Sequence, residues 1–120
     1  MASAVAGKDS VAGKDIVIGL WGDVINTVNR ILDADRKFGF GKIEASLNPS
    51  LTEILHGLGI IEFALTYFLD SELLDHDEIR QALNSKQCVL HIRWLTVALR
   101  DDNEDDYKQA ISLLNSQAKF

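Results

Sequence analysis

The chain has 120 residues, of which 47% are hydrophobic and 25% are charged, and its net charge at pH 7 is −6. This balance is typical of one globular domain, whose core is large enough to fold without a metal or a disulfide. The 18 acidic residues outnumber the 12 basic ones. Because nucleic-acid affinity comes largely from lysine and arginine neutralising phosphates, we predict no direct binding of nucleic acid.

The cysteine content and the hydropathy pattern indicate in which compartment of the cell the protein is located. Cys88 is the only cysteine, which excludes an intramolecular disulfide and fits a reducing environment. The most apolar stretch, residues 51–69, carries Glu53, His56 and Glu62, whereas a membrane span needs about 20 residues that are nearly free of charge. We therefore expect a soluble cytoplasmic protein that does not enter the membrane.

The N-terminal segment differs in composition from the rest. Residues 5–9 and 11–15 both read VAGKD, and a glycine in each copy opposes helix formation. No apolar run of the length found in secretory signals is present. We predict a flexible arm over residues 1–13 and a single helical-bundle domain over 14–120. An arm that becomes ordered on binding a partner is the functional alternative.

The first predicted helix begins at Asp15 and ends before Gly39, because glycine readily adopts the left-handed geometry of a helix C-terminus. Its apolar residues recur at three- and four-residue steps, which is the spacing of one helical face. The continuous apolar run 16–21, with Gly19 inside it, leaves a short buried strand as an alternative. The inward residues of the helix are Val17, Leu20, Trp21, Val24, Val28, Ile31 and Leu32.

A connector over residues 42–48 leads to the clearest helix start in the chain, the capping box of Ser50 and Glu53. The helix predicted over 50–69 is apolar nearly all round. Such a helix is either the central helix of the bundle or packs against another chain as well. Its second apolar face consists of Ile60, Phe63, Ala64 and Tyr67.

Two further helices complete the predicted fold. Asp75 and Glu78 form a second capping pair for a helix over 75–100, and a last helix begins near Asn103 with Tyr107, Ala110, Ile111 and Leu114 facing inward. A break at residues 84–85 and a buried strand over 89–99 are the alternatives. Four to five helices with short connections predict an all-α fold, a compact antiparallel bundle.

No pattern in the chain indicates catalysis, a metal or a cofactor. Glu53 and His56 form one E-x-x-H motif, whereas di-iron bundles need two. The histidines are 20 and 15 residues apart, unlike the paired spacing of structural zinc ligands. Cys88 lies in an apolar run, which is typical of a buried structural thiol. We predict that the protein is not an enzyme and has no catalytic or metal-binding residues.

Acidic residues concentrate in two short segments, which together hold ten of the 18 acids. If the helix over 75–100 is continuous, these clusters lie at opposite ends of the bundle, and if it turns back at 84–85 they can lie side by side. Acids at such positions cap helices and keep a protein soluble, but they can also dock a basic partner. The segments contain Asp70, Glu72, Asp75, Asp77 and Glu78, and Asp101, Asp102, Glu104, Asp105 and Asp106.

These features favour a protein–protein interaction module, namely an adaptor, an inhibitor or an immunity-type protein. Its predicted interaction residues are Ile60, Phe63 and Tyr67, through which we expect a homodimer, and Asp101, Asp102, Glu104, Asp105 and Asp106, which suit a basic protein partner. One alternative is an acidic decoy that inhibits a nucleic-acid-binding protein. Another is a small ligand-binding or enzymatic bundle that uses Glu53, His56 and Glu62.

Overall fold

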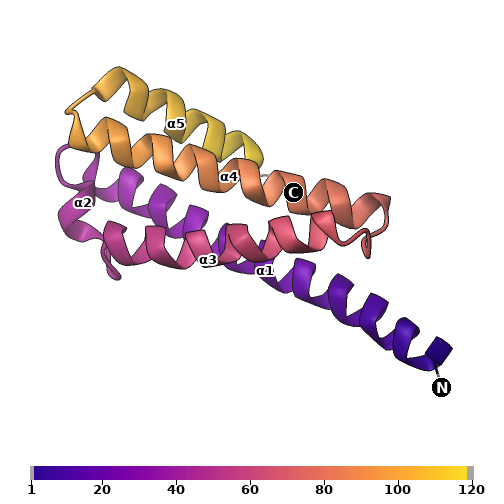
Figure 1. The fold of residues 1–120 in the computed structure, drawn as a ribbon. Helices are drawn as coiled ribbons and strands as arrows, with labels where there is room; N and C mark the ends of the chain where they lie inside the picture. The colour runs from indigo at the N-terminus through magenta and orange to yellow at the C-terminus, as the bar shows by residue number, and fades with distance from the viewer. Residues whose placement is uncertain (1, 119–120) are drawn as a thin grey trace.

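The computed structural model describes the backbone of residues 2–118 and the side chains of residues 15–118. Its helices are α1 (Ala2–Phe38), α2 (Ile43–Ser46), α3 (Leu51–Asp70), α4 (His76–Arg100) and α5 (Glu104–Gln117) (Figure 1). The described residues contain no strand, which confirms the all-α prediction. Residues 16–21 and 89–99, for which a strand was the alternative, are both helical.

The helix α1 is longer than the sequence predicted. It begins at Ala2 instead of Asp15, so it runs through most of the segment expected to be an arm. Once a helix has nucleated, each added residue costs little, and the alanines and lysines of this segment are good helix formers. The side chains of residues 1–14 lie outside the described part, so the flexibility of residues 1–13 stays a prediction.

Successive long helices run antiparallel, and α4 is the central one (Figure 1). It packs against α1, α3 and α5. Of the two roles predicted for the apolar helix over 50–69, the central position is therefore wrong. The helix α3 lies at the side of the bundle, and Leu51, Ile54, Leu58 and Leu65 are its buried residues.

The helix ends follow the predicted local signals. The side chains of Ser50, Asp75 and Asn103 accept hydrogen bonds from the backbone N–H three residues further on, at 3.4, 2.9 and 3.1 Å. These bonds satisfy N–H groups that a helix start leaves without a partner. Gly39 ends α1 with φ of +71°. The predicted connector over 42–48 contains the short helix α2.

The buried side chains form two clusters of unequal size. The larger one joins α1, α2, the first half of α3, the second half of α4 and α5. The smaller one consists of Val17, Leu65, Leu74 and Ala82. It lies where α5 no longer covers α4, because the last residue of α5, Gln117, already contacts residues 87–91 of α4 (Figure 1). The end of the bundle near the α3–α4 loop therefore has the thinner core.

Glu72, in the α3–α4 loop, adopts a left-handed backbone conformation with φ of 61°. This conformation costs an L-residue other than glycine roughly 1–2 kcal/mol. We expect Glu72→Gly to raise the free energy of unfolding by about 1 kcal/mol, because glycine adopts this conformation without strain. The greater freedom of glycine in the unfolded chain reduces this gain. Chemical denaturation measures the change. Glu72→Ala, which removes the carboxylate but keeps Cβ, should give no such gain, and an equal gain would attribute the effect to charge.

Candidate interaction surface on α3

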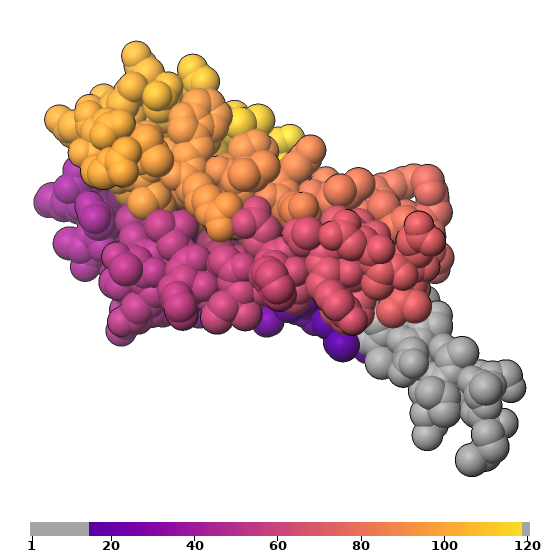
Figure 2. All heavy atoms as spheres, viewed as in Figure 1, coloured from indigo at the N-terminus to yellow at the C-terminus, as the bar shows by residue number. Residues whose placement is uncertain are grey.

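The outer side of α3 exposes large apolar side chains. Ile60, Phe63 and Tyr67 have exposed fractions of 61%, 78% and 62%. In Figure 2 this helix is the magenta-to-pink band along the near face of the molecule, below α4 and α5. The structure thus brings together three of the predicted interaction residues, on a face that no other helix covers within the described residues.

These residues belong to a regular stripe. Glu53, His56, Ile60, Phe63, Tyr67 and Asp70 follow one another at alternating steps of three and four residues, and all six are exposed. This spacing is the one by which a helix packs along another helix in a coiled coil. The stripe, here called the outer stripe, has an apolar centre and a charged or polar residue at each end.

A shallow hollow lies beside the outer stripe. It has a volume of about 460 Å³ and is lined by Leu55, His56, Gly59, Ile60 and Phe63. A methyl group added at Gly59 would meet no atom within 4 Å. The space at Gly59 is therefore not filled by other residues of the described chain, and the hollow is open to a group from outside.

Two contacts fix the borders of the stripe. On the side toward α4, the carboxylate of Glu62 pairs with the guanidinium of Arg93 at 2.8 Å. This ion pair directs the negative charge of Glu62 toward α4. Near the end of α3, the ring of Tyr67 packs edge-on against Phe68, with ring centroids 5.6 Å apart. The tyrosine ring is thus held on the surface.

The helix α3 also has the length and mean hydropathy that would let a helix cross a membrane. A mostly buried core helix of a soluble protein meets the same two criteria, whereas only 22% of the apolar window in α3 is buried. The helix carries Glu53, Glu62 and Asp70 but no lysine or arginine. Its composition by itself thus does not place the protein in a membrane.

The two acidic segments lie at opposite ends of the bundle. Because α4 is continuous over its 25 residues, its ends are about 37 Å apart. In the first segment, Glu78 is buried whereas the other four acids are exposed. The structure therefore separates the predicted acidic docking residues at 101–106 from those at 70–78, and the side-by-side arrangement is wrong.

Within the second acidic segment, two of the predicted residues have local partners. Asp101 pairs with Arg100 at 3.3 Å, and Asp106 accepts a hydrogen bond from the amide of Asn103 at 2.9 Å. Asp101, Asp102, Glu104 and Asp105 are exposed, and Asp106 is half-buried. These acids form one negative patch at the start of α5, where they also stabilise the helix N-terminus.

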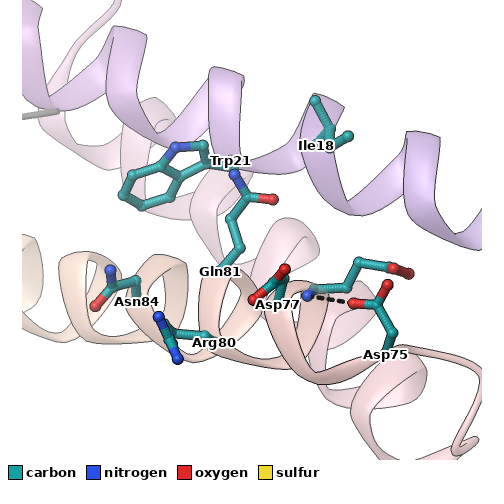
Figure 3. Close-up of a pocket in the computed structure, with 8 residues that line it drawn as sticks. Ile18, Trp21, Asp75, Asp77, Arg80, Gln81 and Asn84 are labelled. Carbon is teal, nitrogen blue, oxygen red and sulfur yellow. Dashed lines mark hydrogen bonds between the residues drawn. The ribbon is translucent and has the colours of Figure 1, made fainter.

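The sequence did not indicate the hollow of about 360 Å³ between α1 and α4 (Figure 3). It forms only when the two helices pack, so no local pattern could reveal it. Ile18 and Trp21 line it from α1, and α4 contributes polar residues. Its lining residues from the α4 side are Asp75, Asp77, Glu78, Arg80, Gln81 and Asn84. Asp75 serves as the helix cap, as the dashed bond in Figure 3 shows.

Cys88 and His91 meet at the end of α5. The side-chain oxygen of Gln117 lies 2.6 Å from Nδ1 of His91 and accepts a hydrogen bond from the thiol at 3.5 Å. Since this oxygen is an acceptor, Nδ1 of His91 carries the hydrogen. Burial raises the pKa of the Cys88 thiol to about 11. The thiol is thus a buried structural group, as predicted, and is poorly suited to act as a nucleophile.

The raised pKa of Cys88 predicts a loss of stability in alkali. The folded chain holds the thiol proton more tightly than the unfolded chain, so this contribution is complete below pH 9 and disappears between pH 9 and about 11. We expect the urea concentration at the midpoint of unfolding to fall more steeply over this pH range for the native sequence than for Cys88→Ala. Tyr107 also has a raised pKa, through burial and its hydrogen bond to Asp35, but it is common to both chains. Equal slopes would contradict the prediction.

The residues of the E-x-x-H motif do not form a metal site with Glu62. Glu62 faces Arg93, whereas Glu53 and His56 belong to the outer stripe. Among the described residues, no three histidine, cysteine, aspartate or glutamate side chains are grouped closely enough to hold a metal ion. Glu53, His56 and Glu62 thus do not form a metal centre, and the ligand-binding or enzymatic alternative remains a prediction.

No protein-family model matches the sequence, and no curated protein or solved structure is significantly similar to it. A functional assignment must therefore start from the surfaces of the molecule. Among the described residues, the outer stripe contains the three most exposed large apolar side chains, those of Ile60, Phe63 and Tyr67. Single apolar residues scattered over a surface are common, whereas a group of them often marks an interaction site.

Proposed function

We propose that this chain is a protein–protein interaction module, of the adaptor, inhibitor or immunity type, and that it binds through the outer stripe of α3. The carrying observation is that Ile60, Phe63 and Tyr67 remain more than half exposed in the folded chain. Covering them removes apolar surface from water, which favours association and is opposed by the loss of translational and side-chain freedom on binding. Aromatic residues are also enriched at the energetic centres of interfaces.

The charges of the chain favour a protein over a lipid surface as the binding partner. Helices that lie on membranes usually carry lysine and arginine on their polar face. The helix α3 has neither, its outer stripe ends in Glu53 and Asp70, and the net charge of the chain is −6. An anionic membrane would repel such a helix. We propose further that the protein is soluble and cytoplasmic and has no enzymatic activity.

The acidic patch at residues 101–106 has a secondary role in this proposal. Exposed charges of one sign accelerate the approach of an oppositely charged partner, and salt screens this effect. The patch lies at the opposite end of the bundle from Asp70 and the α3–α4 loop. It therefore suits a basic protein that binds apart from the outer stripe.

The test is affinity capture from a lysate of the native cells, comparing the tagged chain with Phe63→Asp. We expect the native sequence to retain a stoichiometric protein and the variant to lose it, because an unpaired carboxylate in an apolar interface is strongly unfavourable. The fold should be unaffected, since Phe63 is 78% exposed. Near-identical thermal unfolding of both proteins would establish this.

A matched control is Leu90→Asp, which places the same charge on an exposed apolar residue of α4, 54% exposed and outside the outer stripe. This variant should retain the captured protein. If Phe63→Asp changed neither the mass of the chain in solution nor its bound proteins, the outer stripe would not be an interaction surface.

A further inference from the structure

We infer that the partner covering the outer stripe is a second copy of this chain, bound antiparallel about a two-fold axis that passes beside Phe63. This inference rests on the proposed function, since it requires the stripe to be an interface, and it goes further by naming the occupant and the register. It follows from the order of charged, small and aromatic residues along α3.

The charges at the two ends of the stripe exclude the simplest arrangements. Parallel pairing would place each residue against its own copy, so the two Asp70 carboxylates would face each other. The antiparallel arrangement with Ile60 opposite Phe63 of the second copy would place Glu53 opposite Asp70. Both bring like charges together, which is unfavourable across an interface.

A register centred on Phe63 places no two carboxylates of the stripe directly opposite each other, because Glu53 then lies opposite position 73, beyond the end of α3. His56 and Asp70 are each seven residues from Phe63, on opposite sides. A two-fold axis at Phe63 therefore places the His56 imidazole opposite the Asp70 carboxylate of the second copy, and it does so twice. An imidazole N–H can donate a hydrogen bond to a carboxylate, so the His56 and Asp70 positions of the two copies become complementary.

The same register also matches shape. Gly59 and Tyr67 are each four residues from Phe63. The axis therefore brings the exposed ring of Tyr67 over the hollow at Gly59 of the second copy. That hollow has a volume of about 460 Å³, and Gly59 contributes no side chain to its lining. Each copy supplies one ring and one hollow, so this contact is also made twice.

The surroundings of the stripe are compatible with this pairing. Glu62 lies one position from Phe63, close to the axis, where two free carboxylates would repel each other. Its ion pair with Arg93 at 2.8 Å compensates this charge and directs it toward α4. The centre of the interface is then formed by Ile60, Phe63 and Tyr67.

Cysteine cross-linking tests the register directly in a Cys88→Ala background, which leaves one thiol per chain. With the axis at Phe63, Phe63→Cys places the two thiols next to each other, and we expect a disulfide-linked dimer on mild oxidation. In Ile60→Cys the two positions are separated by six residues along the helices, about 9 Å. This exceeds the Cα separation of roughly 7 Å that a disulfide can bridge.

Sedimentation equilibrium of the full chain tests the charge pairing. We expect His56→Asp to weaken dimerisation at least tenfold and His56→Asp with Asp70→His to restore it, because the exchange recreates both pairs. Asp77→His, an equivalent change outside the stripe, should have no effect. Equal cross-linking through positions 60 and 63, or no recovery in the double variant, would overturn the register.

A chain that stays monomeric at several hundred micromolar would overturn the inference as a whole. If the captured protein were not a copy of this chain and Phe63→Asp no longer retained it, the proposed function would stand and the inference of a homodimer would not. Binding of the monomer to phosphatidylcholine vesicles, abolished by Phe63→Asp, would also overturn it and would identify a lipid surface as the occupant.

Discussion

Replacing Ile92 by alanine is expected to lower the free energy of unfolding by about 3 kcal/mol, within the 2–5 kcal/mol typical of such core substitutions. Ile92 is fully buried in α4, the helix that contacts α1, α3 and α5, and it belongs to the larger cluster. Removing three carbon atoms there leaves a cavity that three helices would have to close. Domains of this size are stable by roughly 5–15 kcal/mol, so the variant should fold but denature at a clearly lower urea concentration.

The matched substitution is Leu90→Ala, two residues away on the same helix. Leu90 is 54% exposed, and we expect its loss to cost under about 0.5 kcal/mol. Urea denaturation of both variants gives the comparison. Similar losses from Ile92→Ala and Leu90→Ala would mean that α4 is not the centre of the core.

The starts of the helices could be predicted because the signals are local. A capping side chain and the N–H that it bonds are three residues apart, so Ser50, Asp75 and Asn103 could be recognised without knowledge of the fold. The continuous course of α4 through residues 84–85 also follows from local preference, since neither residue breaks a helix. Ser85 satisfies its hydroxyl within the helix by donating to the carbonyl of Gln81.

The position of α3 could not be predicted for a physical reason. Periodicity shows which residues share a face, but an apolar face looks the same whether it meets another helix, another chain or water. The sequence identified Ile60, Phe63 and Tyr67 as a second apolar face, and only the packing of α1 and α4 shows that nothing within the described chain covers them.

The candidate site was therefore predicted in part. Ile60, Phe63 and Tyr67 were identified from their spacing. That Gly59 and Asp70 belong to the same surface became clear only when the structure showed the outer stripe to be exposed. Whether the space at Gly59 is filled by neighbouring residues depends on how the helices pack. The spacing of residues along the sequence does not indicate this. From the sequence, the two acidic segments were expected to lie apart only if the helix over 75–100 was continuous. The structure shows that α4 is continuous, so the segments lie apart.

Leu65→Ala should affect one end of the molecule more than the other. Leu65 is the largest fully buried side chain of the smaller cluster, whose other members are Val17, Leu74 and Ala82. We expect a loss of about 3 kcal/mol, which corresponds to roughly a hundredfold faster amide exchange where opening is local. Hydrogen exchange with mass spectrometry should show this in residues 76–84. Leu73→Ala, at an exposed neighbouring site, should leave exchange unchanged.

Ile92→Ala should affect amide exchange in residues 76–84 differently from Leu65→Ala. When the thin end opens by itself, Ile92 remains packed in the larger cluster, so Ile92→Ala should not accelerate exchange in residues 76–84 through this local opening. Leu65→Ala removes the main buried contact that holds this end closed. If both variants accelerated exchange equally along the whole chain, the two clusters would unfold as one cooperative unit. The end of α3 that carries Tyr67 and Asp70 would then be as rigid as the core beneath Ile60.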